Sequence, residues 1–412
     1  MSREPSSVLA ISYRFPPEST PQAIQVPRLL RAIPYPCHVI TGPTRNPNTK
    51  ARVFASVPEN VVSTDRLPDP RRSRARLDRL LGIALPGSYR APDLYLSWAQ
   101  SDRTLSHAER LASDDPHRIM VTFGEPMSDH LLGLEVSRRV QIPWVAHFSD
   151  PWSDSPYRRT GLIARRRNRS LENEVVEACD AVVFTCDEAR ALVMGKYPLS
   201  MRDKAFVIQH LPPPLPVAST GSEQKHVARP TIRHVGHLYG GRSPTPFLKG
   251  LNLYLKNSSF SHAPRLEFIG SVPFRSRSYL WWHRKLRSQV QFLPAVDYDT
   301  SIELMATASI LLAIDDLSSG GAYLLSKLVD YQWSGRPIIG LLPPGASQRF
   351  LIDQQHEVPA ATPENVSKSI SQALSKNGHN QSLNQAAIDH HYVLARDTWD
   401  TVFEFAQRSH GA

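Results

Sequence analysis

The chain has 412 residues, of which 41% are hydrophobic, and its formal net charge at pH 7 is +10. This length favours two domains over one core, and the longest apolar runs are shorter than the 18–20 residues or so that a membrane-spanning helix needs. The three cysteines lack CxxC or Cys/His spacing, and the N-terminal segment lacks the apolar stretch of a secretory signal. We therefore expect a cytoplasmic protein without a disulfide framework, metal or other cofactor.

The positive charge indicates anionic partners, such as nucleotides, phosphates, anionic lipids or nucleic acid. The densest basic stretch is 66–90, where arginines from Arg66 to Arg79 surround apolar residues. Such a segment either lies on an anionic membrane or is a solvated basic helix or loop. Nucleic acid fits less well because no aromatic residues alternate with the basic ones, so we expect no nucleic-acid partner.

Short apolar runs alternate with helical patterns along the chain, which is typical of parallel sheets whose strands are joined by helices. In the first half we predict strands at 7–15, 37–42, 118–124, 143–150, 181–186 and 204–210, and helices at 23–33, 128–139 and 164–179. In the second half we predict strands at 231–238, 265–270, 290–295, 309–314 and 337–342, helices at 246–255, 301–308 and about 325–333, and a mostly helical tail at 365–407.

Between the two series lies a segment rich in Pro and small polar residues, 213–227, which predicts a linker. We therefore expect an α/β protein with two Rossmann-like domains, 1–212 and 228–387, and a C-terminal helix at about 388–412 that packs back on the first domain. In parallel sheets, ligands bind outside the carboxyl ends of the strands. For two such domains this predicts a site in the cleft between them.

Two glycine-containing loops in the second half come between a strand and a helix. One contains Gly240–Arg242; the other, 318–321, precedes a helix on which Lys327 and Asp330 share one face. Backbone N–H groups and the basic side chains could bind a diphosphate, and Asp330 could accept hydrogen bonds from a ribose. Alternatively, these are ordinary strand–helix connections with a solvated Lys–Asp pair.

Polar turns also follow three strands of the first half. Glu18, Ser19 and Gln22 lie near a Pro-Pro loop, and we expect Ser19 or Thr20 to cap the next helix. A second turn carries Glu125 and Ser128 with Asp129, and a third has His147 and Asp150 at or just past the end of a strand. These side chains either bind an acceptor, with Asp150 orienting a hydroxyl or acting as a base, or are structural; a lone His is more often structural.

Four segments together resemble the GT-B glycosyltransferases of family 4. They are "FPPESTPQAIQVPRLLRAI", "VTFGEPMSDHLLGLEVSRRVQIPWVAHFSDPW", "HVGHLYGGRSPTPFLKGL" and "SKLVDYQWSGRPIIGLLPPG", and together they extend over nearly the whole chain. The last is the most specific, since it is close to the family's SKLFEYL-x-x-G-R-P-I-L pattern. The resemblance implies a nucleotide-sugar donor held by the second domain, an acceptor held mainly by the first, and a retaining transfer without a metal ion.

The resemblance also implies roles for particular residues. Asp330 matches the Glu that holds the donor ribose, Arg242 matches a basic residue near the diphosphate, and His147 falls near the active-site histidine. The expected catalytic residues are His147, Asp150 and Arg242; the donor-binding residues are Gly240, Gly241, Arg242, Gly320, Gly321, Ser326, Lys327 and Asp330; and the acceptor-side residues are Glu18, Ser19, Gln22, Glu125 and Ser128.

Two positions depart from the family pattern. Ala322 stands where the family often has a Glu that meets the transferred sugar, and residues 209–211 are Gln-His-Leu in place of Pro-Asn-Gly. We therefore expect either an active transferase that contacts the sugar through other groups, such as the backbone of 320–323, Asp315 and Asp316, or a non-catalytic nucleotide-sugar-binding relative.

The predicted function is transfer of a sugar from a UDP- or GDP-sugar to an acceptor hydroxyl. The basic stretch 66–90 favours a lipid-linked glycan as acceptor, hence surface polysaccharide assembly by an enzyme that is peripheral on the inner face of the membrane. The alternative is a transferase that acts on a soluble small molecule.

Overall fold

The computed structural model describes residues 5–44, 56–70, 92–156, 161–215, 229–257, 263–375 and 382–410. The chain divides into unit 1, Met1–Leu211 with His391–Ala412, and unit 2, Pro212–His390. Most of the expected linker at 213–227, and all of the basic stretch between 71 and 90, lie outside the described residues.

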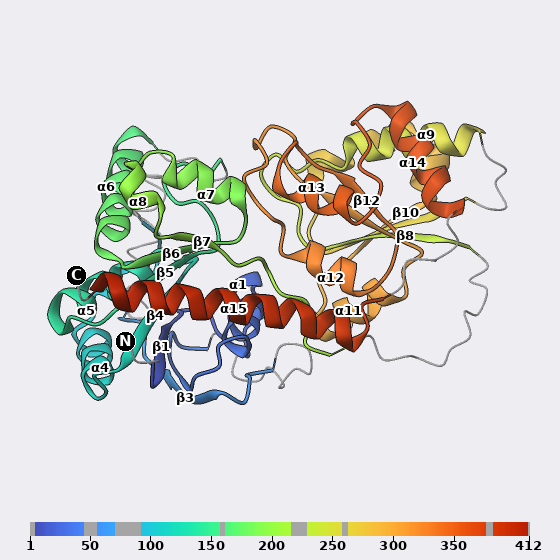
Figure 1. Cartoon of the computed structure of the whole chain (residues 1–412). Helices are drawn as coiled ribbons and strands as arrows, with labels where there is room; N and C mark the ends of the chain where they lie inside the picture. The colour runs from blue at the N-terminus through green and yellow to red at the C-terminus, as the bar shows by residue number, and fades with distance from the viewer. Residues whose placement is uncertain are drawn as a thin grey trace. The chain divides into compact units, whose positions relative to one another are not determined.

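Unit 1 contains a parallel sheet of seven strands in the order β3-β2-β1-β4-β5-β6-β7 (Figure 1). The strands are β1 (Ser7–Ile11), β2 (Cys37–Thr41), β3 (Val61–Arg66), β4 (Arg118–Gly124), β5 (Trp144–Phe148), β6 (Ala181–Phe184) and β7 (Ala205–Val207). The helices are α1 (Pro21–Arg31), α3 (Leu96–Ala99), α4 (Asp102–Ser113), α5 (Ser128–Val140), α6 (Leu162–Ala178), α7 (Asp187–Met194) and α8 (Leu199–Arg202). The prediction of a parallel sheet with connecting helices is confirmed.

Strand β3 and helix α4 were not predicted from the sequence. The strand is an edge strand with the sequence VVSTDR, none of whose residues is buried, so it carries no apolar run. Arg66 is its last residue, and its guanidinium donates to the carbonyl of Pro16. The expectation that Arg66 belongs to an amphipathic basic segment is therefore wrong.

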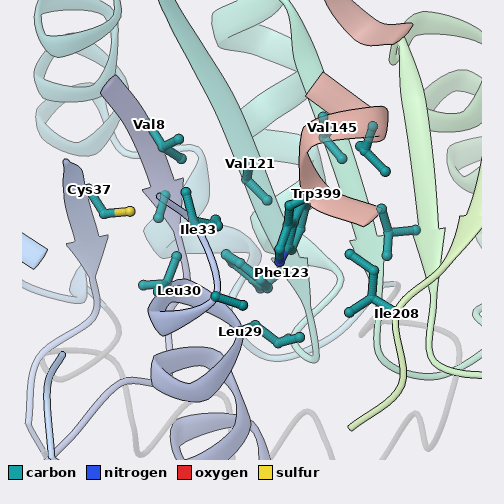
Figure 2. Close-up of a cluster of buried hydrophobic side chains, with 14 of the residues drawn as sticks. Val8, Leu29, Leu30, Ile33, Cys37, Val121, Phe123, Val145, Ile208 and Trp399 are labelled. Atoms are coloured by element: carbon teal, nitrogen blue, oxygen red, sulfur yellow. The ribbon is translucent and has the colours of Figure 1, made fainter. Parts of the chain in front are cut away.

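The core of unit 1 includes the C-terminal half of the long helix α15 (Gln385–His410). Trp399 is fully buried among apolar side chains of α1 and of strands β1, β4 and β5 (Figure 2). At the end of this helix, His410 contacts the carboxylate of Asp180 at 3.2 Å. The end of the chain thereby completes the core of the first Rossmann-like sheet.

Unit 2 contains a parallel sheet of five strands in the order β10-β9-β8-β11-β12. The strands are β8 (Thr231–Val235), β9 (Arg265–Ile269), β10 (Val290–Leu293), β11 (Ile310–Ile314) and β12 (Ile338–Leu341). The helices are α9 (Thr245–Asn257), the 3-10 helix η3 (Phe274–Trp282), α10 (Arg284–Arg287), α11 (Tyr298–Ala306), α12 (Lys327–Trp333), α13 (Ala346–Asp353) and α14 (Pro363–Ser375). Helices α9 and α14 pack so closely that a Cβ on Gly250 would lie 2.3 Å from the Val366 side chain.

Both sheets reverse their strand order at one place. In unit 1 the chain moves outward from β1 to β3 and then returns to place β4 beside β1; in unit 2 it moves from β8 to β10 and returns to place β11 beside β8. The loops that leave such neighbouring strands diverge and open a crevice at the carboxyl ends, which is where ligands bind in doubly wound sheets. Among the described residues, no helix is long and apolar enough to cross a membrane.

Candidate functional site

The crevice of unit 2 is bounded by the loops after β8 and β11, and we call it the unit 2 switch edge. It comprises Gly236, Gly240, Gly241, Arg242, Asp315, Asp316, Gly320, Gly321, Ser326, Lys327 and Asp330. Nε of Arg242 donates to Oδ1 of Asp315 at 2.8 Å, and both residues are buried. The Arg242 guanidinium also lies over the Tyr239 ring, 4.3 Å from its centroid. The two loops are thus tied together by an ion pair largely removed from water.

All four predicted glycines are required by close packing or by backbone conformation, and Gly240 has a φ of +61°. A Cβ on Gly241 would lie 2.0 Å from the Asp316 carboxylate, and one on Gly321 would lie 2.0 Å from the Pro344 carbonyl. Gly320 and Gly321 have φ of +73° and +67°, in the left-handed region that favours glycine. Since the Gly321 carbonyl accepts from the N–H of Ala346 at 2.9 Å, the loop after β11 is fixed against the turn after β12.

Lys327, the first residue of α12, brings its ammonium to the end of β8. A Cβ on Gly236, where φ is +124°, would lie 2.8 Å from Lys327 Nζ. The pKa of Lys327 is lowered to about 7, chiefly by burial and then by the charge of Arg242, although Asp315 opposes this shift. Within the described residues Nζ has neither a hydrogen bond nor an ion pair. A bound anion would offset both the burial of this ammonium and its repulsion by Arg242.

The histidine that lies next to this ammonium is held in its neutral form. Burial lowers the pKa of His234 on β8 well below its usual value, and the charges of Lys327 and Arg242 lower it further. Nδ1 of His234 is 2.9 Å from the Leu312 carbonyl, whereas its buried Nε2 has no hydrogen-bond partner in the described part of the chain. The unit 2 switch edge therefore combines two basic side chains, Arg242 and Lys327, with glycine loops, which are features that suit a phosphate-bearing ligand.

The start of α12 also holds Ser326 and Asp330. Ser326 precedes the helix without forming a side-chain cap. Asp330 lies one turn in and is buried, and the adjacent Tyr331 hydroxyl accepts from the Val235 N–H at 2.9 Å. Ala322 is buried just before this helix. Asp330 is thus held near the end of β8, because its neighbour Tyr331 is hydrogen-bonded to that strand.

The equivalent crevice of unit 1 lies after β1 and β4, and we call it the unit 1 switch edge. Oδ2 of the buried Asp129 accepts from the Tyr13 N–H at 2.8 Å. The Asp93 carboxylate accepts from the Ser128 N–H at 3.0 Å and from its hydroxyl at 2.5 Å. Burial raises the pKa of Asp129 well above its usual range, and the nearby carboxylates of Asp93 and Glu125 add to the shift. Burial also raises the pKa of Asp93.

Three of the predicted acceptor-side residues, Glu18, Ser19 and Gln22, lie between β1 and the first turn of α1, whereas Glu125 directly follows β4. Thr20 caps α1 by accepting from Ala23 N–H at 3.3 Å, so of the two expected caps it is Thr20 that forms this bond, while Ser19 is exposed. Gln22 accepts from the Ser149 hydroxyl at 2.8 Å, and its buried Nε2 has no hydrogen-bond partner in the described residues. Glu18 pairs with Arg14 at 3.5 Å. Gln22 thus connects this loop to the end of β5.

His147 lies near the end of its strand, as the sequence indicates, but its side chain is inside the core. It is the second-last residue of β5 and fully buried, with its ring 5.3 Å from Phe123 and 6.5 Å from Trp399 by centroids. Neither ring nitrogen has a hydrogen-bond partner in another described residue. Burial lowers its pKa to about 3, and nearby His210 contributes. Asp150 lies in the loop after β5 and is part-buried.

Several residues of the two edges could not be found from sequence reasoning. Asp93 lies outside any predicted element, and Gly236, His234 and Tyr331 occur in or beside apolar runs that predict only a strand or a helix. A signal was present for Asp129, which follows Ser128 in a polar turn. The structure brings together Arg242, Asp315 and Lys327 at one edge, and Gln22, Ser128 and Asp129 near the other sheet's carboxyl ends.

The fold is that of GT-B enzymes, although no family model and no curated protein matches the chain. The α,α-trehalose-phosphate synthase (UDP-forming) of Burkholderia vietnamiensis is similar, with a TM-score of 0.59, 13% identity and coverage of 99% of this chain and 100% of that one. Sucrose-phosphate synthase of Thermosynechococcus elongatus is also similar, with a TM-score of 0.59, 15% identity and coverage of 98% of this chain and 97% of that one.

A third similar structure is named as an enzyme of another reaction class, an epimerase. It is a putative UDP-N-acetylglucosamine 2-epimerase of Listeria monocytogenes, with a TM-score of 0.57, 11% identity and coverage of 95% of this chain and 94% of that one. At these identities the likeness establishes the fold, two parallel α/β units of the GT-B type, and the reaction must be argued from the site.

Proposed function

We propose that the protein is a glycosyltransferase that moves a sugar from a nucleotide-sugar donor to an acceptor hydroxyl. One observation carries the proposal: the ammonium of Lys327, which pairs with no described residue, lies beside Gly236 and next to the buried Arg242–Asp315 pair, where the strand order of unit 2 reverses. A diphosphate bound there would be held by charge and by loop N–H groups.

In this proposal the donor binds unit 2. Arg242 and Lys327 neutralise the leaving diphosphate as the glycosidic bond breaks, which supplies the charge stabilisation that transfer without a metal ion needs. Retention of the anomeric configuration is proposed from the resemblance to family 4. Asp330 accepts hydrogen bonds from the ribose, and the backbone N–H groups of the two glycine loops, at Gly240–Gly241 and Gly320–Gly321, bind the phosphates. UDP is the first donor nucleotide to test, since one solved structure of this fold is named as bound with UDP-2-fluoro glucose; GDP is the second.

The acceptor binds unit 1. Its edge offers Glu18, Gln22 and Glu125 as hydrogen-bonding groups, with Ser19 and Ser128 beside them and Asp150 as the group that orients the reacting hydroxyl. His147 is the remaining proposed catalytic residue. Because its imidazole is buried, its role in transfer is tested separately by substitution. The assignment to glycosyltransferase family 4 is part of this proposal.

The acceptor belongs to one of two classes. A lipid-linked glycan in polysaccharide assembly would place the enzyme in the cytoplasm at the membrane surface. A soluble sugar phosphate is the alternative, favoured by the solved trehalose-phosphate synthase of Burkholderia xenovorans, named as a complex with glucose-6-phosphate. Transfer to a lipid extract compared with transfer to glucose-6-phosphate and related sugars separates the two classes.

Calorimetric titration with UDP, GDP and ADP tests the donor site. Lys327→Ala and Asp330→Ala should each weaken binding of the preferred nucleotide by about tenfold or more, whereas Lys256→Ala, at an exposed position on α9, should leave it unchanged. Asp330→Ala should lose no affinity for the corresponding dideoxynucleotide. Unchanged affinity in both variants would refute the donor site.

The reaction itself is tested by NMR on purified protein with nucleotide sugars and acceptors. Transfer with the anomeric configuration retained supports the proposal. Epimerisation of the donor sugar would identify an epimerase, the chemistry named for one solved structure of this fold. Binding of donors without transfer, hydrolysis or epimerisation would identify a non-catalytic relative, the outcome that Ala322 in the usual Glu position would explain.

A further inference from the structure

An aromatic and basic surface lies on unit 2, in the connection between β9 and β10. It comprises Phe274, Trp281, Trp282, Arg284, Lys285 and Arg287, and we call it the Trp–Arg surface. Trp282 is 85% exposed, Phe274 69% and Trp281 55%. Exposed tryptophans next to one another are unusual in a chain whose five other tryptophans, Trp98, Trp144, Trp152, Trp333 and Trp399, are at most 1% exposed.

The packing of the residues on either side keeps these rings exposed. Leu280 and Leu286 on either side are buried in the core of unit 2. His283 stacks on Tyr279 with centroids 4.1 Å apart, and its carbonyl accepts from the Arg287 N–H at 2.8 Å. The Phe274 and Trp281 rings meet edge to face at 5.5 Å. The segment is anchored on both sides, so its aromatic side chains are held facing outward.

The basic residues beside the rings are not neutralised by any residue that the structure describes. Arg284, Lys285 and Arg287 are exposed, and among the described residues their side chains form no ion pair. Three unpaired cations within four positions attract a surface with a high density of negative charge. Tryptophan is also the side chain most enriched at the boundary between lipid headgroups and acyl chains.

We propose that the Trp–Arg surface binds the surface of an anionic phospholipid membrane. Trp281, Trp282 and Phe274 enter the headgroup region, and Arg284, Lys285 and Arg287 pair with lipid phosphates. The combination favours a bilayer over a protein partner, because the rings protrude and the charges all have one sign. The inference concerns binding alone and does not depend on transferase activity; the binding would bring the protein to lipid-linked acceptors.

Vesicle binding monitored by tryptophan fluorescence tests this directly. The full chain is titrated with vesicles of phosphatidylcholine containing 30% phosphatidylglycerol, with and without brominated acyl chains. Because the other tryptophans are buried, quenching by brominated lipid reports on Trp281 and Trp282. We expect a blue shift and quenching with anionic vesicles at low salt, and weaker binding at high salt or with pure phosphatidylcholine.

Two sets of substitutions separate the apolar and the charged contributions. Trp281→Ala/Trp282→Ala should reduce the vesicle partition coefficient, measured by sedimentation, by about tenfold or more. Arg284→Gln/Lys285→Gln/Arg287→Gln should reduce it by about 100-fold, at roughly fivefold per basic residue. The matched control Arg110→Gln/Arg138→Gln/Arg139→Gln removes the same charge from exposed, ion-paired positions of unit 1 and should change it little.

Three outcomes would overturn the inference. One is failure of the full chain to bind anionic vesicles at low salt. Another is binding that the Trp and Arg substitutions leave unchanged, which would assign it to another part of the chain. The last is a concentration-dependent dimer that the Trp substitutions abolish in the absence of any vesicle binding, which would make this surface a contact between copies. Nucleotide affinity is measured on the same variants and should stay unchanged, so that a failure here is distinct from a failure of the donor site.

Discussion

Nε of Arg242 donates a hydrogen bond of 2.8 Å to Oδ1 of Asp315 across the point where the strand order of unit 2 reverses. Arg242 comes from the loop after β8, and Asp315 directly follows β11. Both side chains are buried, so the attraction between them offsets part of the cost of removing each charge from water. The pair thereby fixes the shape of the crevice in which we place the donor diphosphate.

The Arg242–Asp315 pair predicts a coupled loss of stability. Arg242→Ala leaves the Asp315 carboxylate buried without its guanidinium, so the free energy of unfolding should fall by about 3 kcal/mol. Arg242→Ala/Asp315→Asn removes both charges and should recover part of this loss. The measurement is urea unfolding of the wild type, the two single variants and the double variant. Additive effects in this cycle would show that the pair contributes nothing by itself.

Lys327 predicts a pH dependence of donor binding. Its pKa of about 7 in the free protein rises when a diphosphate binds, so binding near pH 8 should take up a proton. Calorimetry with UDP-glucose, whose diphosphate diester keeps a constant charge, in two buffers of different ionisation enthalpy measures this uptake. Affinity should fall above pH 7 in the wild type and show no such dependence in Lys327→Met.

The same lysine lowers stability at neutral pH. Its pKa is about 7 in the folded chain against a reference value of 10.5, so the unfolded chain holds more protons between these pH values. Stability should therefore rise with pH across that window, and Lys327→Met should raise the melting temperature at pH 7. A melting temperature at or below that of the wild type would contradict the burial of this ammonium. Lys256→Met is the exposed control.

Gly320 and Gly321 form a matched pair that separates backbone strain from steric conflict. Both have positive φ, but a Cβ on Gly320 meets nothing within 4 Å, whereas one on Gly321 meets the Pro344 carbonyl at 2.0 Å. Gly320→Ala should cost about 1 kcal/mol of unfolding free energy from strain alone. Gly321→Ala should cost about 2–3 kcal/mol and displace the loop, so it alone should weaken nucleotide binding. Equal effects would contradict this packing.

His147 predicts an acid sensitivity of the fold. Burial lowers its pKa to about 3 from 6.5, so the unfolded chain takes up a proton in this range that the folded chain excludes. Stability should fall as the pH drops below 6.5, by up to about 1.4 kcal/mol per pH unit for this group. His147→Phe should make the fall less steep, and the exposed His117→Phe should not. If His147 also assists transfer, the turnover of His147→Asn should drop without a change in nucleotide affinity.

Much of the fold could be predicted because parallel strands buried on both faces appear as short apolar runs. The runs at 118–124 and 309–314 correspond closely to β4 and β11. Strand β3 escaped prediction because an edge strand needs no apolar run: its two valines are followed by four polar residues, and none of the six is buried.

The candidate site could be predicted only in part. Loop position and residue type identified Arg242, Lys327 and Asp330 as candidates. Sequence reasoning could not find Asp93 or Gly236, because each acquires its position from a residue distant in the chain, Ser128 in one case and Lys327 in the other. Whether a polar group is exposed also depends on neighbours brought by the fold. For this reason the sequence left open whether His147 contacts an acceptor or is structural, and only the fold shows that it lies in the core.

By itself, the sequence determined the type of fold, since the order of apolar runs and glycine loops specifies two parallel sheets and the sites where their strands end. The tertiary structure decided the electrostatics. Only the packing of α12 against β8 places the Lys327 ammonium beside Gly236 and near Arg242, and this removal from water lowers its pKa to about 7. In the unfolded chain a charged side chain is surrounded by water, and only folding brings the neighbouring charges and the burial that shift its pKa.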